Sequence, residues 1–154
     1  MIVDSPTLSS LVELVWASII GLPVEQVEGT DTPSRASASE ETILAGVDVI
    51  GTWNGAVTFE CSRTLGDRLA RAMLCLGDDE AASVDDVRDA LGEIANIAAG
   101  NLKDAVAAPS TLSVPSVIET AGFGTEVPGS SLSNRAWFSC GDEMFSVAVF
   151  EQDD

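Results

Sequence analysis

Apolar residues recur at helical spacing in three segments of the chain. The first segment covers residues 8–20 and ends before Gly21, a residue type that commonly terminates helices. The second segment covers residues 64–76. The third covers residues 83–107, where Ser83 is a preferred N-cap residue. The pattern therefore predicts three helices, of which the third is the longest.

Runs rich in β-branched and aromatic residues predict strands after the first helix. Residues 43–52 and 56–61 flank Asn54-Gly55, a dipeptide typical of two-residue hairpin turns. The polar, glycine-containing stretch at residues 29–37 predicts a loop before them. We therefore expect a loop followed by a β-hairpin between the first and second helices.

The C-terminal third of the chain has the pattern of a strand, a loop and a second hairpin. Residues 111–120 predict the strand, and Pro115 implies a sheet edge or a bend there, because proline cannot donate to a ladder of hydrogen bonds. The glycine-rich residues 122–133 predict the loop. Residues 135–139 and 145–150 then predict a closing hairpin, with apolar side chains alternating along its second strand.

The third predicted helix has two chemically different faces. At about 100° per residue, one face is an apolar stripe made of Val87, Leu91, Ile94, Ala98, Leu102 and Ala105. The opposite face carries Asp89, Glu93, Asn96, Gly100 and Lys103. A glycine inside a helix costs about 1 kcal/mol relative to alanine. A purely structural helix gains nothing from Gly100, whereas a helix that another protein's backbone must approach closely does.

The first and third helices share a short sequence echo. Residues 11–16 (LVELVW) align with residues 91–96 (LGEIAN), and each helix is later followed by a predicted hairpin. The echo is consistent with a duplicated helix-and-hairpin unit, although chance explains so short a match equally well. In this alignment Glu13 corresponds to Glu93, and Trp16 occupies the position of Asn96. We expect Trp16 to be a core or dimer-contact aromatic residue.

The charge composition restricts the classes of partner. The 154 residues include 25 acidic and 7 basic side chains, which gives a formal charge of −18. Such a surface repels phosphate backbones and anionic lipids, so we expect neither nucleic-acid nor membrane binding. The most apolar early stretch, residues 11–22, contains Glu13 and is too short to span a bilayer, and no basic signal-peptide start precedes it. We therefore expect a cytoplasmic protein with one domain over residues 1–154.

The cysteine and histidine content excludes several kinds of site. The chain has three widely spaced cysteines and no histidine, so zinc sites and histidine-based nucleophilic triads are disfavoured. We interpret the cysteines as reduced residues of the protein core.

The Glu93 and Asn96 pair permits two interpretations. Taken alone, the two side chains belong to an ordinary solvated helix face. The second interpretation rests on the chemistry of the side chains. A carboxamide offers N–H donors and an oxygen acceptor without charge, so it can hold a water beside an anionic phosphoryl group without adding repulsion. Phosphoryl transfer depends mainly on such positioning and on charge stabilisation. Under this second interpretation Glu93 grips a cation on a partner, and the pair forms half of a site.

The pattern Asp89-x-x-x-Glu93-x-x-Asn96 resembles the active helix of the CheX/CheC/FliY family of chemotaxis phosphatases, and its CheX branch most closely. The sequence around Gly51-Thr52-Trp53-Asn54-Gly55 resembles the glycine-rich hairpin of this family. The family motif tends to carry a proline some twenty-odd residues after the asparagine. Here Pro115 comes a few residues early, and Glu119 stands near the expected place.

The resemblance implies a fold, an activity and a partner. It implies an α+β fold with a largely antiparallel sheet and packed helices, in a homodimer. It also implies dephosphorylation of the phospho-aspartate of a CheY-type response-regulator receiver domain. In that reaction Asn96 orients the attacking water and Glu93 docks to the receiver's lysine, and Asp89 supports either the helix geometry or the docking. We expect Asp89, Gly100 and Lys103 to form the partner-binding surface. No cofactor is expected on this chain, because the Mg²⁺ belongs to the receiver.

Two other functions remain open at this point. One is a non-catalytic adaptor that binds a phosphorylated receiver through the same helix. The other is a structural component of a flagellar switch, against which the intact Glu93 and Asn96 pair argues.

Overall fold

The computed structural model describes residues 5–22, 24–27, 41–77, 79–106 and 109–153. The loop predicted at residues 29–37 lies outside these residues. Seven strands form one sheet in the order β1-β6-β7-β3-β2-β4, and β5 also pairs with β2; every pairing is antiparallel. The strands are β1 (Glu25–Val27), β2 (Glu41–Gly51), β3 (Gly55–Ser62), β4 (Ser110–Leu112), β5 (Ser116–Ala121), β6 (Ser130–Cys140) and β7 (Glu143–Gln152). The expected α+β fold with a largely antiparallel sheet is confirmed.

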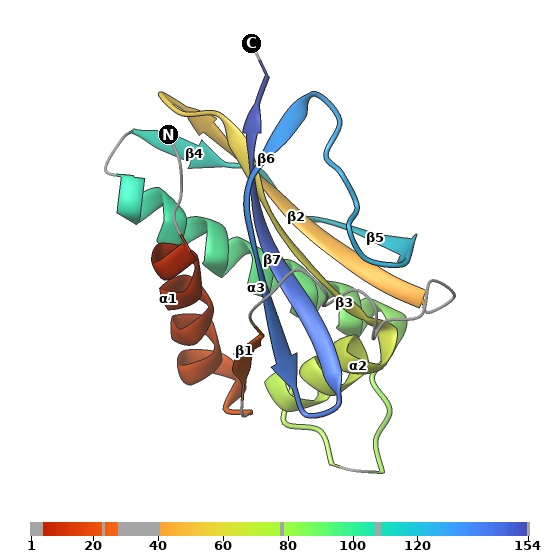
Figure 1. Cartoon of the computed structure of the whole chain (residues 1–154). Coiled ribbons are helices and arrows are strands. Elements are labelled where there is room, and N and C mark those ends of the chain that lie inside the picture. The colour runs from red at the N-terminus through yellow and green to blue at the C-terminus, as the bar shows by residue number, and fades with distance from the viewer. Residues whose placement is uncertain (1–4, 23, 28–40, 78, 107–108, 154) are drawn as a thin grey trace.

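The helices pack together on one face of this sheet. They are α1 (Ser5–Val15), which continues into the π-helical turn η1 (Trp16–Ile20), α2 (Arg63–Met73) and α3 (Val84–Val106). Figure 1 shows α1 beside the C-terminal half of α3 and α2 beside its N-terminal half, and both pairs of helices are in contact. Gly21 ends the first helical segment at φ 70°, as its glycine predicts. α3 therefore lies at the centre of the helical layer.

The sheet topology supports the duplication suggested by the sequence echo. The elements fall into two halves with the same order: α1, β1, β2 and β3 in the first, and α3, the β4/β5 pair, β6 and β7 in the second. If each element is replaced by its counterpart in the other half, the strand pairings of the sheet stay the same. In this exchange the contact between β1 and β6 becomes the contact between the β4/β5 pair and β2, and the central pairing of β3 with β7 maps onto itself. α1 and α3 thus occupy equivalent places in two halves of the molecule.

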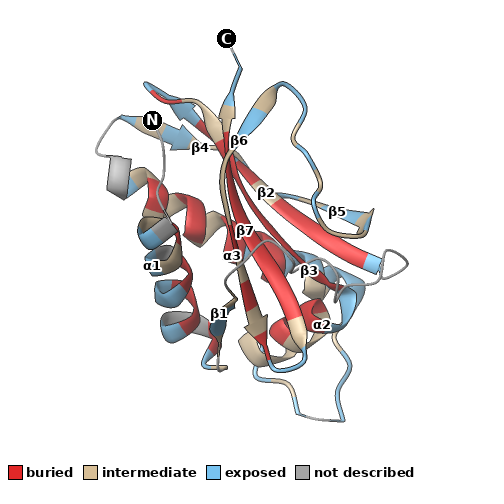
Figure 2. Cartoon of the chain, in the orientation of Figure 1, coloured by how far each residue is buried: buried red, intermediate tan, exposed pale blue. Residues whose placement is uncertain are grey.

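The core lies between the helical layer and the sheet. Buried residues run through the middle of the sheet and along the inward faces of the helices (Figure 2). At its centre the ring of Trp16 stacks on Phe145 with centroids 4.4 Å apart, and Phe145 in turn contacts Phe59 and Phe138. Aromatic pairs of this kind add to the stability that their buried area already supplies. Trp16 is therefore a core residue, one of the two interpretations that the sequence left open.

The opposite face of the sheet contains a buried carboxylate. Glu60 of β3 is 1% exposed, and its two oxygens accept hydrogen bonds from Gly124 N (2.9 Å), Thr125 Oγ1 (2.6 Å) and Thr120 Oγ1 (3.3 Å). These donors belong to β5 and to the glycine-rich segment after it. The carboxylate thus ties that segment to the middle of the sheet, since a buried acceptor without partners would be costly.

Three local expectations need correction. The β2–β3 hairpin forms, but neither residue of Asn54-Gly55 has a positive φ, so the turn is not the two-residue type; Asn54 Oδ1 instead accepts the Gly51 N–H at 3.0 Å. α2 ends at Met73, earlier than predicted, and Cys75 follows with φ 55°. Cys75 is also exposed, so it is not a core cysteine.

The other cysteines and the proline behave as predicted. Cys61 and Cys140 are buried free thiols, and burial raises the pKa of both. The strand predicted over residues 111–120 is interrupted around Pro115 into β4 and β5, which is the bend that proline implied.

Candidate functional site

α3 carries all of the residues that the sequence nominated. Its start is defined by a reciprocal capping arrangement, in which Ser83 Oγ accepts from Asp86 N and Asp86 Oδ2 accepts from Ser83 N, both at 3.0 Å. Asp85 and Asp86 also place negative charge in the first turn, where the free N–H groups favour it. This capping sets where the helix starts and hence which of its residues face the sheet.

The inner face of α3 is buried as the apolar stripe predicted. Leu91, Ile94, Ala98 and Leu102 are each 3% exposed or less, and Val87 is partly buried against the same core. Removing such side chains from water supplies on the order of 1.5–3 kcal/mol for each large one. The outer face is thereby oriented away from the protein.

The outer face presents the predicted polar residues together. Asp89 and Glu93 are exposed, whereas Asn96, Gly100 and Lys103 are half-buried. Residues three or four apart on a helix have Cβ atoms about 5–6 Å apart, so Glu93 and Asn96 are neighbours. Within the described chain, neither side chain has a hydrogen-bond or ion-pair partner. Both are available to a second molecule.

Two glycines of α3 have opposite surroundings. A Cβ added at Gly92 would lie 3.3 Å from Pro115 Cβ, so Gly92 lets the β4–β5 connection approach the helix. A Cβ added at Gly100 would meet nothing within 4 Å. Packing among the described residues therefore explains Gly92 and leaves Gly100 unexplained, and the space beside Gly100 is open.

The structure also places the proline that departs from the family spacing. Pro115 lies against Gly92, one turn before Asn96 on the same side of the helix. The residue at the expected spacing, Glu119, instead accepts a hydrogen bond from Arg63 at 3.0 Å. The early proline is therefore beside the candidate site despite its shifted position in the sequence.

The equivalent positions of α1 do not form a second site of this kind. Glu13 is exposed like Glu93, but Trp16 is 2% exposed and stacks in the core. The helix face around Glu13 thus lacks the carboxamide that Asn96 supplies.

Sequence reasoning missed one residue of this region. Arg88 is exposed, directly precedes Asp89, and donates from Nη1 to the backbone oxygen of Val117 at 3.0 Å. No carboxylate pairs with it among the described residues. Only the tertiary structure reveals this uncompensated charge.

The described residues lack two features, a cluster of metal ligands and a membrane-spanning helix. They contain no group of three or more cysteine, aspartate or glutamate side chains arranged to hold a metal ion. They also contain no helix that is both long and apolar enough to cross a membrane.

The chain matches the model of a known protein family. The model of the family described as "Chemotaxis phosphatase CheX" matches residues 43–137, well over half of the chain, and this range includes α3. A comparison with the sequences of curated proteins gives no match.

Comparison with solved structures shows the same fold in several bacterial proteins. The chemotaxis protein CheX from Vibrio vulnificus is similar with a TM-score of 0.72 at 18% identity, over 94% of this chain and 93% of that chain. CheX from Desulfovibrio desulfuricans gives 0.70 at 20% identity, over 96% and 98%. The CheX–CheY–BeF3–Mg complex from Borrelia burgdorferi gives 0.64 at 12% identity, over 99% and 100%.

Proposed function

The chain belongs to the family of the chemotaxis phosphatase CheX, and on this premise we propose that it hydrolyses the phospho-aspartate of a CheY-type response-regulator receiver domain. The observation that carries the proposal is the uncovered face of α3. There Glu93 and Asn96 are adjacent and have no partner in the described chain, and the space at Gly100 is open. A helix face that is oriented outward and left unpaired is suited to entering another protein's site.

The division of labour follows from the chemistry of the two side chains. Asn96 holds a water with its carboxamide, in line with the phosphorus–oxygen bond to the receiver's aspartate. The water attacks phosphorus, the bond to the aspartate oxygen breaks, and inorganic phosphate and a free carboxylate result. Asn96 takes up no proton and carries no charge, so its contribution is positioning, which can lower a barrier by several kcal/mol.

Glu93 docks to the receiver. Its exposed carboxylate forms an ion pair with the receiver's lysine and so fixes the approach of Asn96 one turn further along the helix. Asp89 and Lys103 lie on the same face and contact the rim of the receiver, while Gly100 leaves room for its backbone.

The metal requirement is assigned to the partner. Near Asn96 the carboxylates on the face are Asp89 and Glu93, and no three ligand-type side chains converge in the described chain. As the family resemblance implies, we propose that the Mg²⁺ belongs to the receiver, where it would neutralise the charge of the phosphoryl group when bound. A receiver partner also implies a cytoplasmic protein. We further propose a homodimer, as the family resemblance implies, which analytical ultracentrifugation would test.

A decay assay separates an enzyme from an adaptor. Receiver domains of the same organism are phosphorylated with a small phosphodonor in Mg²⁺, the donor is removed, and phosphate loss is followed with and without the chain. We expect decay of one receiver to accelerate at catalytic amounts of the chain. Binding without faster decay would show an adaptor instead.

A further inference from the structure

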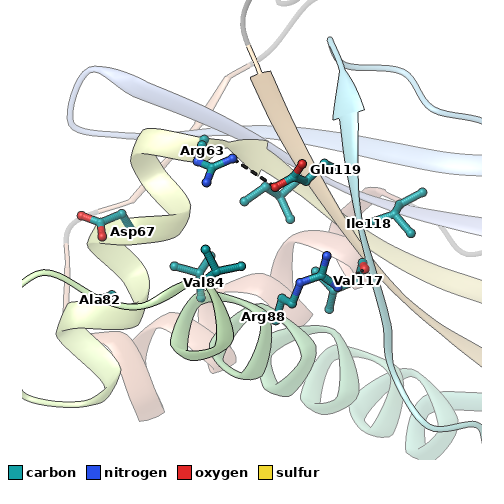
Figure 3. A pocket seen from close by; sticks show the side chains of 10 residues that line it. Arg63, Asp67, Ala82, Val84, Arg88, Val117, Ile118 and Glu119 are labelled. Carbon is teal, nitrogen blue, oxygen red and sulfur yellow. Dashed lines mark hydrogen bonds and ion pairs between the residues drawn. The ribbon is translucent and has the colours of Figure 1, made fainter.

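A small apolar cavity lies at the N-terminal end of α3, between that helix, α2 and β5 (Figure 3). Ile43, Val87 and Val117 form its apolar wall, and its volume is about 90 Å³. Val84 stands at its edge and is 54% exposed, whereas the side chain of Ile118 points to the other side of β5, away from the cavity. The cavity is therefore apolar inside and opens to solvent beside Val84.

The size of the cavity decides what kind of group fits it. Sites for free small molecules usually measure about 300–1,000 Å³, several times more than this one. An apolar cavity of about 150 Å³ is large enough to hold benzene, so a cavity of this size suits one aliphatic side chain. A side chain presented by a partner protein is therefore a better occupant than a free ligand.

The charges beside the cavity indicate which partner presents it. Arg63 pairs with Glu119 (3.0 Å) and Glu41 (3.4 Å), and the cavity's other carboxylate, Asp67, pairs with Arg71 (3.0 Å). Arg88, at the same cavity, contacts only a backbone oxygen, so its charge remains available. In a chain of net charge −18, such an arginine attracts an acidic partner toward this end of α3.

The cavity lies on the same helix as the proposed phosphatase face, toward the N-terminal end of α3. Arg88 directly precedes Asp89 and lies eight residues before Asn96, about 12 Å along the helix. A specific protein interface buries about 800 Å² on each partner, which extends well beyond this separation. A receiver that docks on Glu93 and Asn96 is therefore within reach of the cavity.

We propose that this cavity is a second docking point for the receiver and accepts one of its aliphatic side chains, while Arg88 pairs with an acidic residue beside that side chain. The inference rests on the proposed function. It assigns selection among receivers to Arg88 and the cavity, and hydrolysis to Asn96, about two turns further along the helix.

Two matched pairs of variants test the cavity and the arginine. Ala82 lines the cavity on the α2–α3 connection, whereas its exposed neighbour Ala81 does not. Ala82→Phe should fill the cavity, and Ala81→Phe adds the same ring outside it. Arg88→Gln removes the available charge, and Arg68→Gln removes the charge of an arginine that also donates to a backbone oxygen but does not line the cavity.

The measured quantities are the Kd for the beryllofluoride-loaded receiver in Mg²⁺ and the kcat and KM of phosphate release. Ala82→Phe should raise Kd and KM about tenfold with little change in kcat, the size of effect expected at a buried contact. Arg88→Gln should raise both about threefold, and high salt should reduce the difference from wild type. Ala81→Phe and Arg68→Gln should behave as wild type, and circular dichroism checks that all four fold.

The outcomes separate this inference from the proposed function. If wild type binds and hydrolyses but Ala82→Phe and Arg88→Gln match their controls, the cavity inference is wrong and the proposed function stands. If wild type binds without hydrolysis and both variants bind more weakly, the cavity is supported and the enzyme proposal fails. If wild type binds no receiver, both are wrong.

Discussion

α1 and α3 occupy equivalent places in the two halves of the sheet, yet only α3 carries the candidate site. In the sequence alignment both helices expose a glutamate, Glu13 and Glu93. Three residues later the helices diverge, because Trp16 reaches into the aromatic core while Asn96 stays half-buried and has no partner among the residues that the structure describes. An equivalent position in the fold is therefore not enough to create a functional site. The site depends on the chemistry of one residue at the boundary between core and solvent.

The surroundings of the two helices differ as well. Leu14 of α1 is 54% exposed, whereas its counterpart in α3, Ile94, is 1% exposed. α3 is covered on both flanks by α1 and α2, so it is held more firmly against the sheet (Figure 1). A residue that must position a water within a fraction of an ångström benefits from such a rigid support.

The largest predicted effect is the loss of protein stability when Trp16, the counterpart of Asn96 in the first helix, is truncated. Trp16→Ala removes a ring that stacks on Phe145, and it should lower the free energy of unfolding by about 3–5 kcal/mol. The dephosphorylation rate per folded molecule should stay close to that of wild type. Urea unfolding followed by fluorescence measures the first quantity, and the decay assay the second. A loss below about 1 kcal/mol would contradict the assignment of Trp16 to the core.

A smaller and opposite effect is expected at Gly100. Gly100→Ala should stabilise the protein by about 0.5–1 kcal/mol, because alanine favours the helix and its Cβ meets nothing within 4 Å. The same methyl group should weaken receiver binding if the partner's backbone approaches there. Thermal unfolding and receiver titration measure the two effects.

Gly92 is the matched control for Gly100. Gly92→Ala gains the same helix propensity but brings a Cβ to 3.3 Å from Pro115, so its stability gain should be smaller. Its receiver binding should be unchanged. Equal binding by the Gly100 variant and wild type would remove the role assigned to that glycine.

The smallest effects on stability should be at the two glutamates. Glu13→Ala and Glu93→Ala should each change the free energy of unfolding by less than about 0.5 kcal/mol, because both side chains are exposed. Receiver binding should distinguish them, with a higher Kd for the Glu93 variant alone. Isothermal titration with the beryllofluoride-loaded receiver makes the comparison. Equal weakening by both variants would indicate general electrostatics rather than docking by Glu93.

Local patterns predicted much of this molecule, and contacts between distant segments account for the rest. The stripes of α3 follow from helical periodicity, so both of its faces could be predicted residue by residue. β1 was missed because its three residues form a strand only by pairing with β6. The burial of Glu60 likewise depends on the segment after β5 crossing the sheet.

The site itself shows the same limit. Glu93, Asn96 and Gly100 could be nominated because they interrupt a helix face in a recognisable pattern. Arg88 could not be nominated from the sequence, because it is one of seven basic residues and nothing in the sequence shows which of them lacks an acidic partner. That becomes visible only when the positions of the carboxylates in three dimensions are known. The cavity beside it arises from α2, α3 and β5 together, and no single segment of sequence encodes it.

The central claim is that Asn96 positions the attacking water, and single-turnover hydrolysis by Asn96→Ala tests it most directly. The receiver is saturated with wild type or variant, and the rate of phosphate loss is compared with the Kd for the beryllofluoride-loaded receiver. We predict that the variant loses at least about a hundredfold in the accelerated rate while its Kd changes less than about threefold. An accelerated rate equal to that of wild type at saturation would contradict the claim.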